Sequence, residues 1–162
     1  MSTLFLATDD LRGLVEDIWS SLFEELFELP LDEDAPLPED VVTAYVDIRG
    51  GWQGRVLVAT TTEGALSLAA HMLRIPETSV AEADLADAIG ELANIVGGSV
   101  KSCVDGQSSL SLPNVSRYAP GAAGPDALEV LATWNDHPLC IRVAPARPLI
   151  PSRRLGTEGE KA

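Results

Sequence analysis

Residues 84–101 read DLADAIGELANIVGGSVK, and their spacing predicts a helix with two sharply different sides. Apolar side chains recur every three or four positions, as they do in a helix that packs one face on a core. At about 100° per residue, the polar residues gather on the opposite side of the axis. The polar side comprises Asp84, Asp87, Glu91, Asn94, Gly98 and Lys101.

Glu91 and Asn94 are the residues of this helix with the most chemical interest. They are three residues apart, so they are neighbours on the helix surface. Each interior glycine costs about 1 kcal/mol relative to alanine, which close packing within the domain or close docking of a partner would offset. An ordinary solvated face is the alternative, since Glu-x-x-Asn is a short pattern. The small residues that flank the pair are Ala86, Gly90, Ala93 and Gly97.

The chain before this helix predicts a helix, a β-hairpin and a second helix. The apolar residues over 9–27 recur at helical spacing. Residues 41–49 alternate between apolar and polar, which is typical of a half-buried strand, and two glycines at 50–51 turn the chain into a second strand over 55–60. The segment over 31–38 is an acidic, proline-containing loop.

Capping residues set the expected ends of the two helices that follow. Thr61 or Thr62 is the N-cap of the second helix, and Pro76 ends it. Ser79 and Glu82 have the spacing of a capping box, which starts a third helix that runs to about residue 104. The inner stripe of the second helix is expected to comprise Leu66, Ala69, Ala70 and Leu73.

The remainder of the chain predicts more strands. Leu110 and Leu112 belong to a short strand before a proline, and 116–126 is a loop rich in glycine, proline and alanine. Residues 128–134 and 139–143 form two strands around a four-residue turn. The predicted fold class is therefore α+β, an antiparallel sheet with helices packed on one face.

Length and composition restrict the class of protein. A chain of 162 residues fits one domain, which we place at 1–151, with a disordered tail over 152–162. The net charge of −14 argues against nucleic acid and anionic membranes as partners. Cys103 and Cys140 are too few for a disulfide framework and suit no zinc motif, so we expect reduced thiols and no metal site. Without a signal-peptide pattern or a long apolar run, the expected location is the cytoplasm.

The string from Glu91 to Lys101 resembles the ExxN phosphatase motif of the CheC/CheX/FliY chemotaxis family. That motif reads Glu, apolar, any residue, Asn, two apolar residues, a small residue and Gly, and the whole third helix fits it. CheC-type members usually carry two such motifs. Here the first helix has Glu16 and Trp19 at the equivalent spacing, and Trp19 belongs to the apolar stripe. A single motif is the CheX-like pattern, and the resemblance extends over about residues 9–148.

The resemblance implies a hydrolase, a protein aspartyl-phosphate phosphatase that acts on a phosphorylated CheY-like response regulator. Asn94 would orient a water for in-line attack on phosphorus, and Glu91 would pair with a lysine of the regulator. Neither residue would form a covalent intermediate. The chain would need no cofactor of its own, because the Mg²⁺ is carried by the partner response regulator.

The resemblance also implies a homodimer and a rim of partner contacts. Asp84, Asp87, Gly98 and Lys101 share the face of the two motif residues and are the expected contacts, although ordinary solvation explains them equally well. Two other roles remain open for the chain. One is a CheX-like module that binds a signalling partner without hydrolysis. The other is a dimeric scaffold whose glycine-rich helix only packs subunits.

Overall fold

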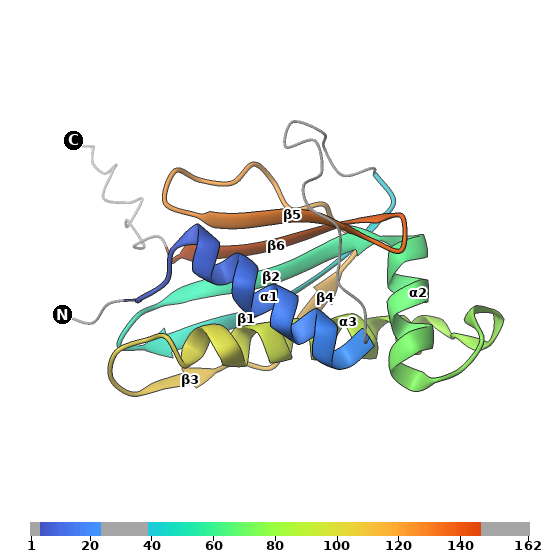
Figure 1. The fold of residues 1–162 in the computed structure, drawn as a ribbon, viewed down its shortest axis with the longest axis horizontal. Coiled ribbons are helices and arrows are strands. Elements are labelled where there is room, and N and C mark those ends of the chain that lie inside the picture. The colour runs from blue at the N-terminus through green and yellow to red at the C-terminus, as the bar shows by residue number, and fades with distance from the viewer. Residues whose placement is uncertain (1–3, 24–38, 147–162) are drawn as a thin grey trace, which may run out of the picture.

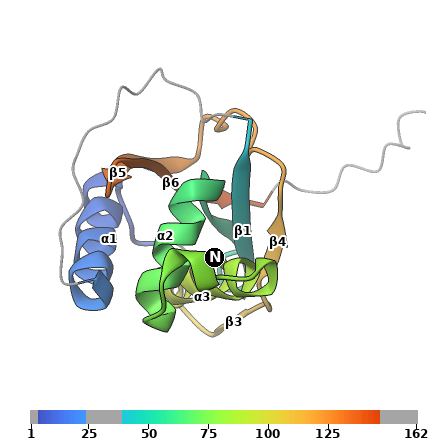
Figure 2. The same cartoon turned by 90° about the vertical axis from the view of Figure 1, so that its right-hand side faces the viewer.

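The computed structural model describes residues 4–23 and 39–146, and these form one sheet with helices against it (Figure 1). Figure 2 shows α1 beside β5 and, on the other side of α3, β4. The elements are α1 (Thr8–Phe23), β1 (Val41–Gly50), β2 (Gly54–Thr61), α2 (Thr62–Leu73), the 3₁₀ turn η1 (Glu77–Ser79), α3 (Glu82–Lys101), β3 (Ser108–Leu110), β4 (Asn114–Ser116), β5 (Leu128–Trp134) and β6 (His137–Pro145).

The sheet has the strand order β3-β1-β2-β6-β5, and β4 also pairs with β1. All of these pairings are antiparallel. Register places Val46 of β1 opposite Val56 of β2, and Val56 opposite Val143 of β6, so one face is apolar across the central strands. The helices cover this face, which confirms the predicted α+β class.

The core lies between that sheet face and the three helices. The buried residues of α1 are Leu11, Val15, Trp19 and Phe23. The Phe23 ring lies 5.0 Å from the Trp134 ring between centroids, which ties α1 to β5. Since Trp19 is fully buried, its assignment to the apolar stripe is confirmed.

Both hairpins occur where the alternation predicted them. The β1–β2 pair runs from Val41 opposite Thr61 to Ile48 opposite Gly54. The second hairpin turns more tightly than expected, through Asn135 (φ 52°) and Asp136 (φ 66°). Two successive positive φ values are typical of the two-residue turn that suits the twist of a hairpin, so β6 starts at His137 rather than at 139.

The predicted inner stripe of α2 is confirmed at Ala69 and Ala70, while Leu66 is only partly buried and the prediction for Leu73 is wrong. Thr61 is the N-cap, and its hydroxyl accepts a hydrogen bond from the N–H of Gly64 at 3.0 Å. Leu73, expected inside, is 44% exposed. The helix ends there because Arg74 adopts a left-handed conformation (φ 59°), two residues before Pro76. The buried side comprises Gly64, Ala65, Ser67, Leu68, Ala69 and Ala70.

The predicted limits of α3 need two corrections. Ser79 belongs to η1 and forms no capping box; the N-cap is Ala81, whose N–H donates to the Asp84 carboxylate at 2.9 Å. The helix ends at Lys101 rather than near 104, because the chain tightens there into a turn in which the N–H of Cys103 donates to the Val100 carbonyl at 2.9 Å.

Strand β4 was not predicted, and it overlaps the loop predicted over 116–126 only at Ser116. It pairs Val115 with Ala44 of β1 and so brings the chain back beside α3. The last residues of the predicted first helix, 24–27, the acidic loop over 31–38 and the tail over 152–162 lie outside the described residues. The domain limits of 1–151 remain a prediction.

Candidate docking face on helix α3

Helix α3 packs on β1 by the apolar arc that the sequence predicted. Leu85, Ile89, Leu92 and Val96 are buried, and each belongs to the core. Figure 2 shows α3 running below the sheet beside β3 and β4. Because the arc is fixed on the sheet, the orientation of the polar side is fixed as well.

The polar side of α3 carries both motif residues, but only one of them is exposed. Glu91 and Asp87 are exposed, and Asn94 is half-buried. Neither the Glu91 side chain nor the Asn94 side chain has a hydrogen-bond or ion-pair partner among the described residues. A mid-helix amide without a partner is able both to donate and to accept, and the neighbouring carboxylate is able to accept from a cation. Gly98 and Lys101, both half-buried, continue the same side toward the helix end.

The three glycines of α3 have different surroundings, so the need for a residue without a side chain differs among them. A Cβ atom on Gly97 would overlap Val46 Cγ2 and lie 3.2 Å from Leu110 Cδ1, so this glycine permits close packing of α3 on β1 and β3. A Cβ on Gly90 would meet Pro113 at ordinary contact distance, 3.5 Å. A Cβ on Gly98 would meet nothing within 4 Å. Internal packing therefore explains Gly97, and only Gly98 leaves open space on the polar side.

The small residues beside the motif pair do not all lie on an open surface. Gly90, Ala93 and Gly97 are buried, because the segment from β3 to β4 covers that flank of the helix. Open access is limited to the side around Glu91 and Gly98.

The same covering segment exposes a residue that the sequence did not single out. Leu110 packs toward Gly97, as expected for a strand residue next to a helix. Leu112 instead is 87% exposed, the highest value among the large hydrophobic side chains of the described residues. Alternation would place Leu110 and Leu112 on the same face of a strand, but β3 ends at Leu110, so Leu112 lies outside the strand and is exposed.

The N-terminal end of α3 is held by polar contacts. Asp84, one of the expected contact residues, is half-buried and caps the helix. Arg117, which follows β4, donates to Glu82 at 2.7 Å, to Asp40 at 3.3 Å and to the Thr62 hydroxyl at 2.6 Å. The hydrogen bond from Thr62, followed by the contact with Arg117, holds the pKa of Asp40 below its usual value. Through Arg117, these contacts join the starts of α2 and α3 to the chain that directly follows β4.

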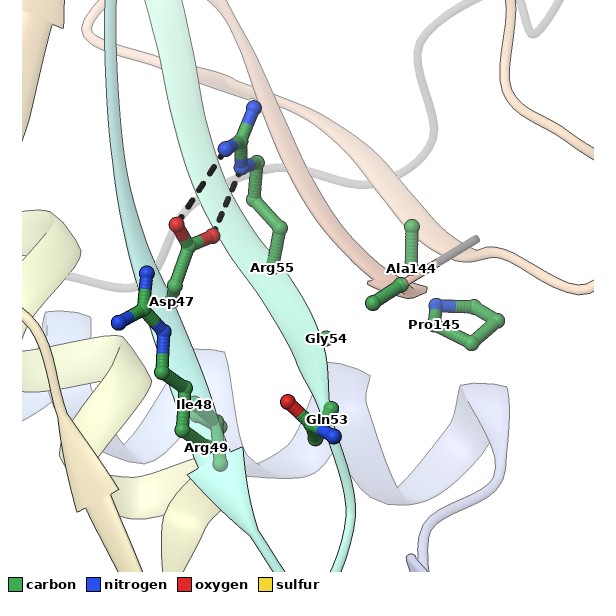
Figure 3. Close-up of a pocket in the computed structure, with 9 residues that line it drawn as sticks. Asp47, Ile48, Arg49, Gln53, Gly54, Arg55, Ala144 and Pro145 are labelled. Atoms are coloured by element: carbon green, nitrogen blue, oxygen red, sulfur yellow. Dashed lines mark hydrogen bonds and ion pairs between the residues drawn. The ribbon is translucent and has the colours of Figure 1, made fainter. Parts of the chain in front are cut away.

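A hollow of about 400 Å³ lies away from this face, at the end of β1, β2 and β6 (Figure 3). Three charged residues line it, and two of them, Asp47 and Arg55, form an ion pair with Arg55 Nε 2.8 Å from Asp47 Oδ1; the third is Arg49. Asp47 and Arg55 alternate along their strands with Val46 and Val56, so they face away from the helices. The lining of the hollow does not include Glu91 or Asn94, so the hollow is separate from the motif residues.

Cysteines and clusters of metal-binding side chains are the other groups that could carry chemistry in the described residues. Both cysteines are free thiols. Burial, followed by the charge of Glu129, raises the pKa of Cys140 to about 12, so this thiol stays protonated near neutral pH. The described residues contain no group of three or more His, Cys, Asp or Glu side chains placed to hold a metal ion. Among the described helices, none has the length and apolar character needed to span a membrane.

The sequence matches a family model described as "Chemotaxis phosphatase CheX" over residues 42–127, more than half of the chain. The chain belongs to the CheX family. The matched range contains α2, α3 and the covering segment, and so the whole candidate face of this CheX-family chain. No curated protein is significantly similar to the chain in sequence.

Solved structures show the same fold. The chemotaxis protein CheX from Vibrio vulnificus is 13% identical, with a TM-score of 0.65 over 86% of this chain and 98% of that one. A chain of the CheX-CheY-BeF3-Mg complex from Borrelia burgdorferi is 15% identical, with a TM-score of 0.66 over 85% and 96%. A putative chemotaxis protein from Desulfovibrio vulgaris Hildenborough is 15% identical, with a TM-score of 0.64 over 88% and 98%. At these identities the likeness establishes the CheX fold of the chain.

Proposed function

We propose that the protein docks on a phosphorylated CheY-like response regulator and promotes hydrolysis of its aspartyl phosphate. One observation supports this most strongly: the side chains of Glu91 and Asn94 lie on the polar side of α3 without a hydrogen-bond or ion-pair partner among the described residues, in a chain of the chemotaxis phosphatase CheX family. A complex of CheX with CheY, BeF3 and Mg²⁺ is known for the Borrelia burgdorferi protein, which has the same fold.

In this proposal Asn94 acts by position. Its carboxamide enters the regulator's phosphorylation site and holds a water in line with the phosphorus and the leaving aspartate oxygen. An amide is neutral and binds water through both its donor and its acceptor groups, so it aligns the nucleophile without acting as a base. The phosphoryl group passes to this water, and the regulator recovers its free carboxylate.

Glu91 fixes the docking register. Its exposed carboxylate forms an ion pair with a lysine beside the phosphorylation site, which is a charge-assisted contact. The acidic side chain of Asp87 lies one turn earlier on the same face and adds to the attraction, while Gly98 leaves room for the regulator's backbone. The Mg²⁺ at the phosphoryl group belongs to the regulator, and this chain supplies no metal ligand.

The test is the lifetime of the phosphorylated regulator. Each single-domain CheY-like regulator of the source organism is phosphorylated with a small-molecule donor, freed of donor and mixed with the protein in excess Mg²⁺. The proposal predicts faster release of inorganic phosphate from at least one of them. Binding of the regulator without any change in its phosphate lifetime would instead identify a non-catalytic module.

A further inference from the structure

Leu112 is exposed directly beside the turn of α3 that carries Asn94. The covering segment runs antiparallel to α3, because Leu110 lies at Gly97 and Pro113 lies at Gly90. From Gly90 to Gly97 the helix rises about 10.5 Å, and the three extended residue steps from Leu110 to Pro113 span about 10 Å, so the two segments cover nearly the same length. Leu112 therefore passes α3 at the level of Leu92 and Ala93, between Glu91 and Asn94.

The backbone at Leu112 is held on both sides. The N–H of Ser111 donates to the Asp47 carbonyl at 2.9 Å, and the Ser111 hydroxyl accepts from the Asp47 N–H at 2.8 Å. The same hydroxyl donates to the carbonyl of Leu112 at 3.0 Å. Pro113, which fixes its own backbone angle, rests against Gly90. The leucine is thus presented to solvent from a fixed position.

Single exposed leucines are common on protein surfaces, so exposure alone says little. Two further facts distinguish this one. Its backbone is ordered in advance, which lowers the entropic cost of an apolar contact. It also adjoins a charged face, and apolar centres with polar surroundings are the usual build of a protein interface.

We propose that Leu112 is an apolar anchor that binds the response regulator beside its phosphorylation site. This inference rests on the proposed function. Leu112 would contribute affinity by burying its side chain against the regulator, while Asn94 would contribute to the chemical step. The occupant is the regulator rather than a second copy of this chain, because Leu112 is continuous with the face that carries Glu91 and Asn94.

The test separates affinity from chemistry. Binding is measured by titrating fluorescently labelled regulator, loaded with beryllofluoride and Mg²⁺, with wild type, Leu112→Ser, Leu112→Met and Leu22→Ser. Leu22 is the matched control, because it is an exposed leucine (40%) on α1, away from β4 (Figure 2). Leu112→Ser should weaken binding about tenfold or more, as expected for the loss of a buried leucine. Leu112→Met, which keeps an apolar side chain, and the control should bind within about threefold of wild type.

Phosphate release supplies the second readout. At saturating concentrations Leu112→Ser should release phosphate as fast as wild type, because Asn94 is intact. Unchanged affinity in Leu112→Ser would overturn the inference while leaving the proposed function in place. A change in the mass of the free protein on Leu112→Ser, measured by sedimentation, would overturn it too, because the leucine would then serve contacts between copies. If the wild type neither binds nor dephosphorylates any regulator, the proposed function itself fails and the anchor fails with it.

Discussion

The two adjacent glycines of α3 should respond oppositely to the same substitution. Alanine at Gly98 meets nothing within 4 Å, so it should gain the helix propensity of alanine, about 1 kcal/mol. Alanine at Gly97 gains the same propensity but forces its methyl group into Val46 Cγ2. Val46 is β-branched and fully buried on β1, so it has little freedom to move away.

The expected magnitudes follow from these two effects. Overpacking of a core costs about 1–3 kcal/mol, so Gly97→Ala should be destabilised by about 1 kcal/mol net of its propensity gain. Gly98→Ala should be stabilised by up to about 1 kcal/mol. The two variants should therefore differ by about 2 kcal/mol, or about 4–8 °C in melting temperature for a chain of this size.

Urea unfolding followed by circular dichroism at 25 °C measures this difference directly. The dependence of the unfolding free energy on urea should be the same in both variants, which shows that only stability has changed. If Gly97→Ala were as stable as Gly98→Ala, the close approach of α3 to β1 would be wrong. The assignment of the open side of the helix would then be wrong as well.

Three further predictions concern charge and reactivity. The pKa of Asp40 is lower in the folded state than in the unfolded state, so the Asp40 carboxylate stabilises the fold at pH values above its unfolded-state pKa. This stabilisation is lost as the pH falls through the folded-state pKa. The difference in unfolding free energy between wild type and Asp40→Asn should therefore shrink in acid unfolding curves. Native protein at pH 8 should be alkylated by iodoacetamide at half-buried Cys103 and not at Cys140, whose pKa is about 12, and mass spectrometry that finds rapid labelling of Cys140 would contradict its burial. Glu91→Gln should weaken binding of the beryllofluoride-loaded regulator by about tenfold and lessen its salt dependence, whereas the exposed control Glu77→Gln should not.

The strongest patterns of the sequence predicted the elements that position the site. The apolar arc of α3 and the alternation of β1 determine which sides are buried, because each repeats over several turns or pairs. The polar side with Glu91 and Asn94 followed from the same periodicity. Which side of α3 faces away from the core could therefore be predicted before any tertiary contact was known.

The details that depend on tertiary contacts could not be predicted. Helix α2 itself is rich in small residues, so its sequence does not fix which side is buried, and packing in the fold buries Leu68 rather than Leu73. Strand β4 has three residues, too few to show a period. Leu112 lies beyond the end of β3, next to Ser111, which bonds to Asp47 64 residues away, and local sequence does not reveal such a contact.

The homodimer, the cytoplasmic location and the contact roles of Asp84, Asp87, Gly98 and Lys101 remain predictions. Asp84 also caps α3, so replacing it would change helix stability along with any contact. Gly98→Leu is the cleaner probe of docking, since the fold leaves room for the side chain. Sedimentation of the full chain measures the oligomeric state independently of the regulator.

The central claim is that Asn94 positions the attacking water. The most direct measurement is single-turnover phosphate release from the phosphorylated regulator with excess wild type or Asn94→Ala. Binding of the beryllofluoride-loaded regulator is measured on the same samples. If Asn94 positions this water, Asn94→Ala should still bind but should release phosphate only at the regulator's own rate. Release by Asn94→Ala as fast as by wild type would contradict it.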